Sequence, residues 1–328
     1  MPFLIEPEAA AGPLDRRTLL GLTAGAAATL VLGGCGTTGG TAPEQETRTE
    51  EGAFGPVEVP VSPERIVATD FYTTYALLDV GVTVVATVEA ATGGVLPSLQ
   101  AAYDAIPKVG RAQEPSLEAI AAQEPDLILG TLTPALPEDL PERLSGVAPT
   151  LMLPADGAPG TWQQRAVRAA EVVGRGPEAE ALRDRYEQRA REIGERHRDL
   201  LGRIRIGLVR GGAPGIAQVD LPDSWGGVVL GAIGARMPAI AEGKPGASEE
   251  VSYEDLGVLD DCDILLHHAD TDGGIQGNTR RMLDAPTFQA LPAVTAGRLY
   301  PLPNYYVAHY GQGEAVLTEL DRILGEQG

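Results

Sequence analysis

Apolar and polar positions alternate in short blocks along residues 54–154, and these blocks predict strands and helices in turn. Short β-branched runs bounded by glycine, proline or aspartate are typical of buried strands, whereas apolar residues three or four positions apart are typical of helices. The predicted strands are residues 64–70, 82–88, 125–130 and 149–154, and the predicted helices are 73–81 and 116–123. Strands that alternate with helices favour a parallel sheet covered on both faces.

A different pattern follows, because residues 162–201 contain little strand signal. Apolar or aromatic residues recur every three or four positions from Pro177 onwards, at Leu182, Tyr186, Ala190, Ile193, His197 and Leu200. This stripe on a charged background predicts an amphipathic helix over 177–201, and assigns His197 a structural place on it. A helix of about 24 residues is about 36 Å long, which is enough to connect two lobes.

The alternation of strands and helices resumes after this helix. Residues 203–212, 262–270 and 297–303 predict strands, and residues 225–234 and 313–324 predict helices. Residues 116–129 and 252–266 also resemble each other, since each segment has a serine, a glutamate two positions later and then an aspartate before an apolar run. Two similar units on either side of a long helix predict two lobes that face each other across a cleft.

The N-terminus has the features of an export signal. Arg16 and Arg17 precede an uncharged run over 18–34, which is short for a bilayer span and is followed by Cys35. We expect a twin-arginine-like lipoprotein signal peptide over 1–34, with Cys35 as the lipidated residue. The alternative is an uncleaved anchor helix, and either case places the body of the protein outside the cytoplasm, tethered to the membrane. Residues 35–52 contain no large apolar residue, so we expect a flexible tether there.

The charge of the chain excludes one class of partner. Asp and Glu total 46 against 25 Lys and Arg, which gives a formal net charge of −21. Nucleic acids are bound by basic surfaces, so we expect no nucleic-acid partner. The two cysteines provide no disulfide framework, because lipidation of Cys35 leaves Cys262 alone.

Three segments resemble the substrate-binding proteins of ABC importers for iron-siderophores, haem and cobalamin. They are residues 108–130 (KVGRAQEPSLEAIAAQEPDLILG), 251–266 and 291–303. The resemblance implies an α/β fold, with two Rossmann-like lobes joined by one long rigid helix and a ligand cleft between them. The domains would be an N-terminal lobe (53–160), a helical segment (161–201) and a C-terminal lobe (202–328).

The same resemblance implies a function and partners. We expect an extracytoplasmic carrier on the outer face of the cytoplasmic membrane that captures an Fe(III)-siderophore complex. It would be a monomer that is not an enzyme and has no cofactor of its own, and it would deliver the chelate to an ABC-importer permease dimer. In this family a glutamate on each lobe meets arginines of the permease, and Glu118 and Glu254 occupy those positions. The alternative is that each carboxylate only stabilises the N-terminus of its helix.

The cargo site is expected just after the predicted strands, where arginines can neutralise an anionic chelate and aromatic rings can pack on it. The candidate ligand-binding residues are Tyr72, Tyr75, Arg111, Arg210, Trp225, His268, Tyr305 and Tyr306. Each has a structural alternative, such as a surface ion pair for either arginine or core packing for Trp225. Strand alternation allows only one of His267 and His268 to face the cleft.

Other functions remain open from the sequence. Haem is one alternative cargo, with an axial ligand among Tyr72, Tyr305, His268 and His309, and cobalamin is another. A bare metal ion is disfavoured because the chain has four histidines and no histidine-rich loop, so we expect no metal site. A surface enzyme is also disfavoured, since no G-x-S-x-G, H-E-x-x-H or P-loop motif is present. A lipoprotein that only senses or scaffolds would leave Glu118 and Glu254 without a use.

Overall fold

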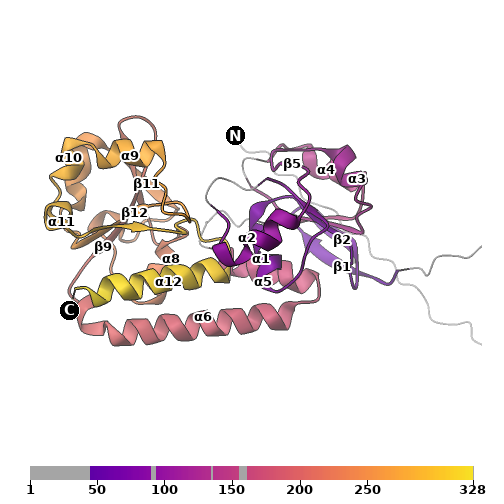
Figure 1. The fold of residues 1–328 in the computed structure, drawn as a ribbon, viewed down its shortest axis with the longest axis horizontal. Coiled ribbons are helices and arrows are strands. Elements are labelled where there is room, and N and C mark those ends of the chain that lie inside the picture. The colour runs from indigo at the N-terminus through magenta and orange to yellow at the C-terminus, as the bar shows by residue number, and fades with distance from the viewer. Residues whose placement is uncertain (1–44, 90–93, 134–135, 155–160, 328) are drawn as a thin grey trace, which may run out of the picture. The chain divides into compact units, whose positions relative to one another are not determined.

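The computed structural model describes residues 45–89, 94–133, 136–154 and 161–327. The predicted leader, Cys35 and the first part of the predicted tether lie outside the described residues. Residues 45–328 form one compact unit, in which two α/β lobes are joined by helices (Figure 1). Within the described ranges, no helix has both the length and the apolar composition required to cross a membrane.

The first lobe contains a four-stranded parallel sheet in the order β4-β3-β7-β8. This arrangement confirms the parallel sheet predicted from the alternating pattern. The strands of this lobe are β1 (Thr47–Gly52), β2 (Gly55–Pro60), β3 (Ile66–Ala68), β4 (Ala86–Thr87), β5 (Gly110–Arg111), β6 (Glu114–Pro115), β7 (Leu127–Thr131) and β8 (Thr150–Leu153). Its helices are α1 (Phe71–Asp79), α2 (Pro97–Ala105), α3 (Leu117–Ala121) and α4 (Leu140–Ser145).

Both faces of this sheet are buried, because successive side chains of each strand point to opposite sides. In β3 and β7, Ile66 and Leu127 belong to the cluster that includes α1, whereas Val67 and Ile128 belong to the cluster that includes α3 and α4. Such strands read as continuous apolar runs, which is why the sequence predicted them.

The tether predicted over 35–52 is wrong for its last six residues. Residues 47–52 form β1, which pairs antiparallel with β2. Arg48 donates hydrogen bonds to the carbonyl oxygens of Val61 and Val172, each at 2.8 Å, and Glu50 forms ion pairs with Arg48 and Arg168. These polar contacts with distant residues stabilise β1. The strand contains no apolar residue, so its sequence alone did not predict it.

The second lobe contains a five-stranded sheet in the order β11-β10-β9-β12-β13. Strands β9, β12 and β13 are parallel to one another, whereas β10 pairs antiparallel with both β9 and β11, so this sheet is mixed. The strands are β9 (Ile206–Gly211), β10 (Ile216–Asp220), β11 (Ser248–Ser252), β12 (Ile264–His268) and β13 (Leu299–Leu302). The helices are α8 (Gly227–Ala232), α9 (Gly277–Leu283), α10 (Pro286–Gln289) and α11 (Pro292–Thr295), with 3-10 helices η2 (Ala239–Ala241) and η3 (Tyr253–Leu259).

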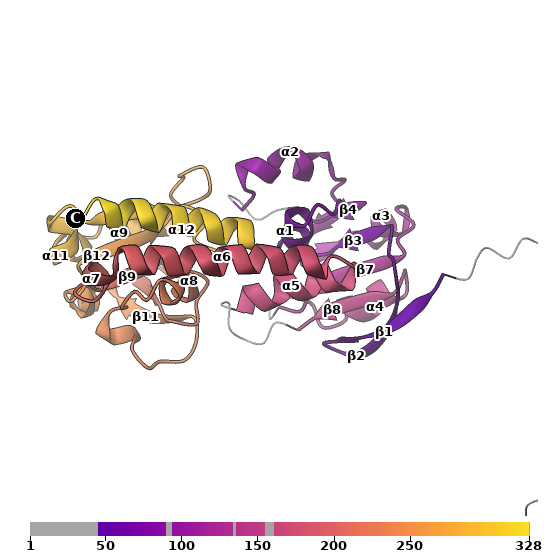
Figure 2. The same ribbon diagram turned by 90° about the horizontal axis from the view of Figure 1, so that it is seen from below.

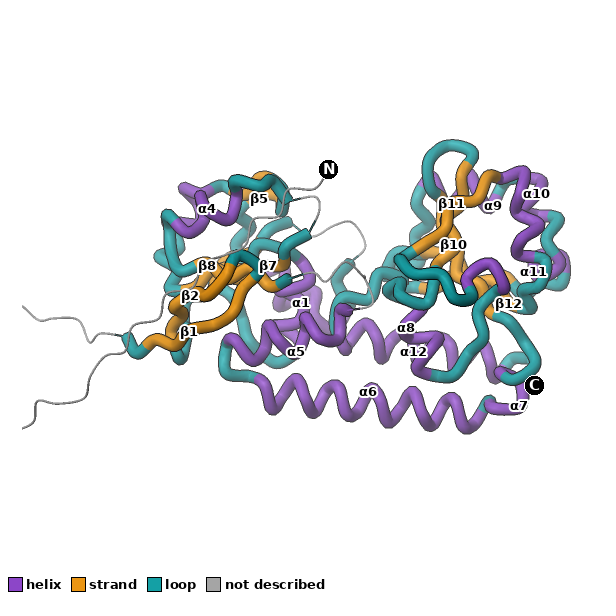
Figure 3. Tube along the Cα trace, turned by 180° about the vertical axis from the view of Figure 1, so that it is seen from behind, coloured by secondary structure: helices purple, strands orange, loops and turns teal. Residues whose placement is uncertain are grey.

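The lobes are joined by α6 (Gly176–Arg196), which packs against α5 (Trp162–Val172) at one end and against α8 at the other. The predicted helix over 177–201 is interrupted at His197, after which the short α7 (Arg198–Leu201) follows. The C-terminal α12 (Tyr310–Gly325) lies beside α6 (Figure 2), so a pair of helices spans the lobes. Figure 3 shows the strands of both lobes on the same side of α6.

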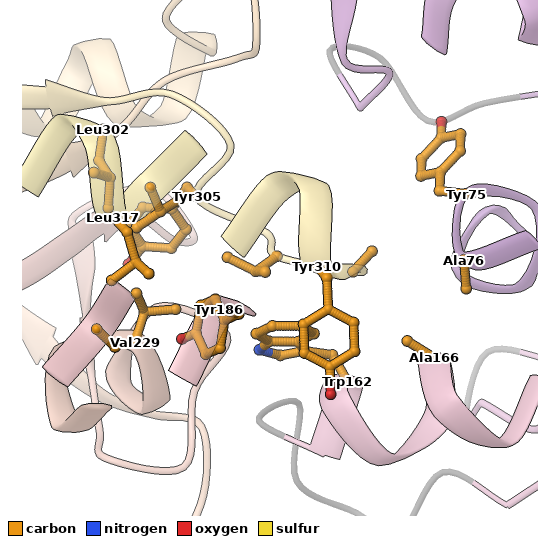
Figure 4. Close-up of a cluster of buried hydrophobic side chains, with 14 of the residues drawn as sticks. Tyr75, Ala76, Trp162, Ala166, Tyr186, Val229, Leu302, Tyr305, Tyr310 and Leu317 are labelled. Carbon is orange, nitrogen blue, oxygen red and sulfur yellow. The ribbon is translucent and has the colours of Figure 1, made fainter. Parts of the chain in front are cut away.

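Aromatic side chains fill the junction between these helices. Trp162, Tyr186 and Tyr310 come from α5, α6 and α12 and make edge-to-face contacts, with ring centroids 5.3–5.8 Å apart (Figure 4). A Cβ atom on Gly313 would lie 2.9 Å from the Tyr186 ring, so a glycine there lets α12 approach. Gly194 has the same role on α6, where a Cβ would lie 2.7 Å from the carbonyl oxygen of Ile233.

Candidate functional site

A pocket of about 370 Å³ lies between the two lobes, within the usual size range of small-molecule sites. Aromatic residues dominate its lining, and they come from the start of α1, the segment before α8, the end of β12 and the segment after β13. The lining residues are Phe71, Tyr72, Tyr75, Gly94, Trp225, His268, Ala269, Asp270, Asn304, Tyr305, Tyr306 and Gln312.

The first lobe contributes the opening turns of α1. Asp70 ends the β3 segment and caps this helix, since its carboxylate accepts hydrogen bonds from the Thr73 amide at 2.8 Å and from the Thr131 amide at 2.6 Å. The cap fixes the start of α1 at Phe71, and the next residues place Tyr72 and Tyr75 at the pocket. The rings of Phe71 and Tyr72 are 4.1 Å apart, centroid to centroid.

The second lobe contributes a compact group of rings. His268, at the end of β12, contacts Tyr305 and Tyr306, with centroids 5.3 and 4.8 Å apart. Trp225 meets Tyr306 edge-to-face at 4.9 Å. Burial lowers the pKa of His268, although Asp270, 3.7 Å away, acts in the opposite direction. The imidazole is therefore neutral at neutral pH.

A buried ion pair lies behind this group. Arg210 Nε is 3.5 Å from Asp220 Oδ1, and the guanidinium lies over the Trp225 ring at 6.0 Å. Burial raises the pKa of the Asp220 carboxyl to about 6, although Arg210 acts in the opposite direction. Asp220 is fully buried, so the positive charge of Arg210 is compensated inside the protein.

Six of the eight candidate ligand-binding residues line the pocket, namely Tyr72, Tyr75, Trp225, His268, Tyr305 and Tyr306. Arg210 does not line it but contacts Trp225 from behind. Arg111 is not at the pocket: its side chain is 81% exposed on the β5–β6 hairpin and forms an ion pair with Glu89 at 3.8 Å. The VGR segment includes β5 of this short hairpin, and its arginine is exposed to solvent.

Sequence reasoning missed several residues at or near the pocket. Asp270, Asn304 and Gln312 line it, and the aromatic segment around Tyr305 could have indicated Asn304. Arg165 was also missed, because it lies in a helix rather than after a strand; its guanidinium is 5.1 Å from the Tyr72 ring centroid.

The histidines do not gather into a metal site. His267 is buried outside the pocket lining, and its Nδ1 lies 3.0 Å from the His268 carbonyl oxygen. Of the two neighbouring histidines, only His268 therefore lines the pocket, as strand alternation predicted. His309 Nδ1 lies 2.9 Å from Asp79, and His197 Nε2 lies 2.8 Å from Asp321. Within the part of the chain that the structure describes, no three His, Cys, Asp or Glu residues are placed to hold a metal ion together.

Two carboxylates outside the pocket share one local geometry. Glu118 follows Ser116, which caps α3 by accepting from the Ala119 amide, and Glu254 follows Ser252, which caps η3 by accepting from the Asp255 amide. Both glutamates are exposed, and among the described residues neither forms an ion pair. α3 and α10, against which η3 packs, lie at the top of Figure 1, opposite α6.

Comparison with known proteins identifies the family. The family model described as periplasmic binding protein matches residues 65–306. A curated relative, the "Probable siderophore-binding lipoprotein YfiY" of Bacillus subtilis, is 27% identical over 195 residues. That match covers 59% of this chain and only 58% of the relative.

Solved structures resemble the chain over a larger share of its length. The siderophore periplasmic binding protein from the fuscachelin gene cluster of Thermobifida fusca matches with a TM-score of 0.72 and 29% identity, over 82% of this chain and 98% of that one. SirA of Staphylococcus aureus, complexed with staphyloferrin B, matches with a TM-score of 0.70 over 85% of this chain and 99% of its own. Its identity of 17% supports the shared fold alone.

Proposed function

This chain belongs to the periplasmic binding protein family, and from that premise we propose that it captures a ferric siderophore between its lobes and delivers it to an ABC-importer permease. The observation that carries the proposal is the aromatic pocket between the lobes, to which both lobes contribute side chains. The names of two relatives agree with this cargo class, since the curated relative is described as siderophore-binding and the Thermobifida fusca protein as a siderophore periplasmic binding protein.

The pocket suits a large chelate more than a bare ion. Rings from α1 and from the segment after β13 can pack on the organic shell of a ferric complex, because aromatic faces bury large areas at low entropic cost. Asn304 and Gln312 add amide groups that can orient polar atoms of the ligand. A bare metal ion would instead need several converging ligands.

We propose no enzymatic role for this site. Cys262 is the one nucleophilic thiol among the described residues, and it is buried in the core of the second lobe away from the pocket. Burial raises the pKa of this thiol, so it stays protonated and unreactive. The protein would carry its cargo unchanged, with no cofactor of its own.

Docking on the permease would use Glu118 and Glu254. Each is exposed at the start of a capped helix, and one belongs to each lobe. α3 and α10, against which η3 packs, lie opposite α6 in Figure 1. Because neither carboxylate forms an ion pair within the described residues, both are available for charge-assisted contacts with cationic side chains of a partner. Their spacing depends on how the lobes are held, so docking would sense that arrangement.

The proposed location is the outer face of the cytoplasmic membrane. The sequence supports it through Arg16, Arg17 and Cys35, with cleavage before Cys35, lipidation of that cysteine and export by the twin-arginine route. Mass spectrometry of the membrane-extracted protein would test the anchor: a diacylglyceryl group on an N-terminal Cys35 is expected, and an intact leader would contradict it.

A fluorescence titration tests the cargo. Trp225 lines the pocket, so a bound ferric complex should quench its emission. We expect saturable quenching with a Kd below about 1 μM, or about −8 kcal/mol, for a ferric siderophore and much weaker binding of its iron-free form. Haem and cobalamin serve as alternative cargoes in the same panel, and exclusive binding of either would overturn the siderophore proposal.

A further inference from the structure

The pocket contains little positive charge for a site that would receive an iron chelate. No lysine or arginine occurs among its lining residues, and the ionisable groups there other than tyrosine are His268 and Asp270. Burial lowers the pKa of His268, so its imidazole is neutral at neutral pH. Asp270 is then the one formally charged side chain among the described lining residues. The side chain of Asp270 is 14% exposed.

The two arginines nearest the pocket each face a buried carboxylate. Arg210 lies 3.5 Å from Asp220, which is fully buried and ionised above pH 6. Arg165 interacts electrostatically with Asp70, which is 5% exposed and accepts hydrogen bonds from the Thr73 hydroxyl and the Thr131 amide. The charge of Arg210 is therefore compensated by a buried carboxylate, and neither arginine lines the pocket.

The remaining basic residues of the described chain lie outside the pocket lining. Residues 90–93, 134–135 and 155–160, the internal segments that the structure does not describe, contain no lysine or arginine, and their one charged residue is Asp156. Arg111 is on the hairpin and 81% exposed. Within the described residues, the pocket lining therefore contains no lysine or arginine.

We infer that the cargo of this pocket carries no net negative charge, as in a neutral or cationic ferric trihydroxamate and unlike a ferric tricatecholate. This inference rests on the proposed function and specifies its substrate class. Enclosing a triply negative chelate beside Asp270, in a lining without lysine or arginine, would strip its hydration without supplying counter-charge. A neutral trihydroxamate loses little hydration free energy when it moves from water into the pocket. In a cationic one, a pendant ammonium group could pair with Asp270.

Three ferric complexes that differ in charge test the inference on the purified protein. They are ferrioxamine B (cationic), ferrichrome (neutral) and ferric enterobactin (triply negative), each titrated against Trp225 fluorescence at physiological ionic strength. We expect at least one trihydroxamate to bind at least about 100-fold more tightly than the tricatecholate. Tighter binding of the tricatecholate overturns the inference but leaves the siderophore proposal standing. No binding of any complex overturns both.

An Asp270→Asn variant tests the role of charge directly. It should weaken ferrioxamine B about threefold or more, leave ferrichrome unchanged and strengthen ferric enterobactin. Asp223→Asn is the matched control, since Asp223 is exposed two residues before Trp225 but does not line the pocket. An equal loss for all three complexes would indicate a structural defect instead of a charge effect, and would contradict the assignment of Asp270.

Discussion

Asp220 lies fully buried beside Arg210, and this position couples its protonation to folding. Burial raises the pKa of the folded-state carboxyl to about 6, whereas an unfolded aspartate titrates near 3.9. Below the lower value both states are protonated. As pH rises through about 6, the folded state must hold a buried charge, so this residue stabilises the fold in acid and loses that contribution towards neutral pH.

We therefore predict an unusual pH dependence from Asp220→Asn. The free energy of unfolding of wild type, minus that of the variant, should fall by about 3 kcal/mol between pH 4 and pH 7. Urea unfolding at several pH values measures this difference, in which the other carboxyls cancel. A difference that rises with pH would contradict this prediction, because Arg210 would then lower the folded-state pKa of Asp220 by more than burial raises it.

Tyr306 provides the second residue-level prediction. Its ring contacts Trp225, His268 and Tyr305 with centroids 4.9, 4.8 and 5.4 Å away, so it is central to the aromatic group of the second lobe. Tyr306→Leu should weaken cargo binding about tenfold or more, by loss of ring packing. Arg111→Ala should leave Kd unchanged, and a matching loss in both variants would contradict this location of the site.

The sequence indicated the aromatic residues of the site better than its charges. Tyr72, Tyr305 and Tyr306 follow predicted strands, and parallel strands present their carboxyl ends at one edge. Whether an arginine is compensated depends instead on partners far along the chain or on another element, as with Arg210 and Asp220. Such pairing has no local signal, which is why Arg111 and Arg210 appeared to be cargo ligands.

At the scale of elements, α6 approaches the end of α8 closely at Gly194. A Cβ on Gly194 would lie 2.7 Å from the backbone oxygen of Ile233, which cannot rotate away as a side chain could. Gly231 on α8 provides the contrast, since a Cβ there would meet nothing within 4 Å.

Paired substitutions test this contact. Gly231→Ala should stabilise the protein by about 0.5–1 kcal/mol through helix propensity. Gly194→Ala gains the same propensity but should destabilise by about 1–3 kcal/mol, because α6 must move away from α8. Thermal unfolding compares them, and two equal stabilisations would mean that the helices are not closely packed at Gly194.

The local sequence pattern did not predict the strands that depend on partners distant in the sequence. Strands β3, β7 and β12 are short apolar runs and were predicted within a few residues. Strand β1 depends on Arg48 reaching Val172, and β10 follows β9 after a tight turn inside what reads as a glycine-rich loop. Antiparallel pairing of β10 with β9 follows from that turn and not from periodicity.

At the scale of the whole molecule, the proposed docking surface combines one glutamate from each lobe. Glu118→Lys with Glu254→Lys should abolish siderophore-dependent iron uptake by the importer while leaving the Kd for cargo unchanged, since neither residue lines the pocket. Glu180→Lys is the matched control: Glu180 is an exposed glutamate on α6, a helix that lies opposite α3 and α10 in Figure 1. Uptake at the wild-type rate in the double variant would reduce both glutamates to stabilisers of their helix N-termini.

In the proposed function, iron binds as a chelate in the pocket between the lobes. Crystals grown with a ferric siderophore, measured at the iron absorption edge, locate the metal independently of any assumption about the ligand. We expect one anomalous peak, enclosed by Tyr72 and Tyr75 from the first lobe and by Trp225 and Tyr306 from the second. An iron peak elsewhere on the protein, or none in crystals of a protein that binds the complex in solution, would contradict it.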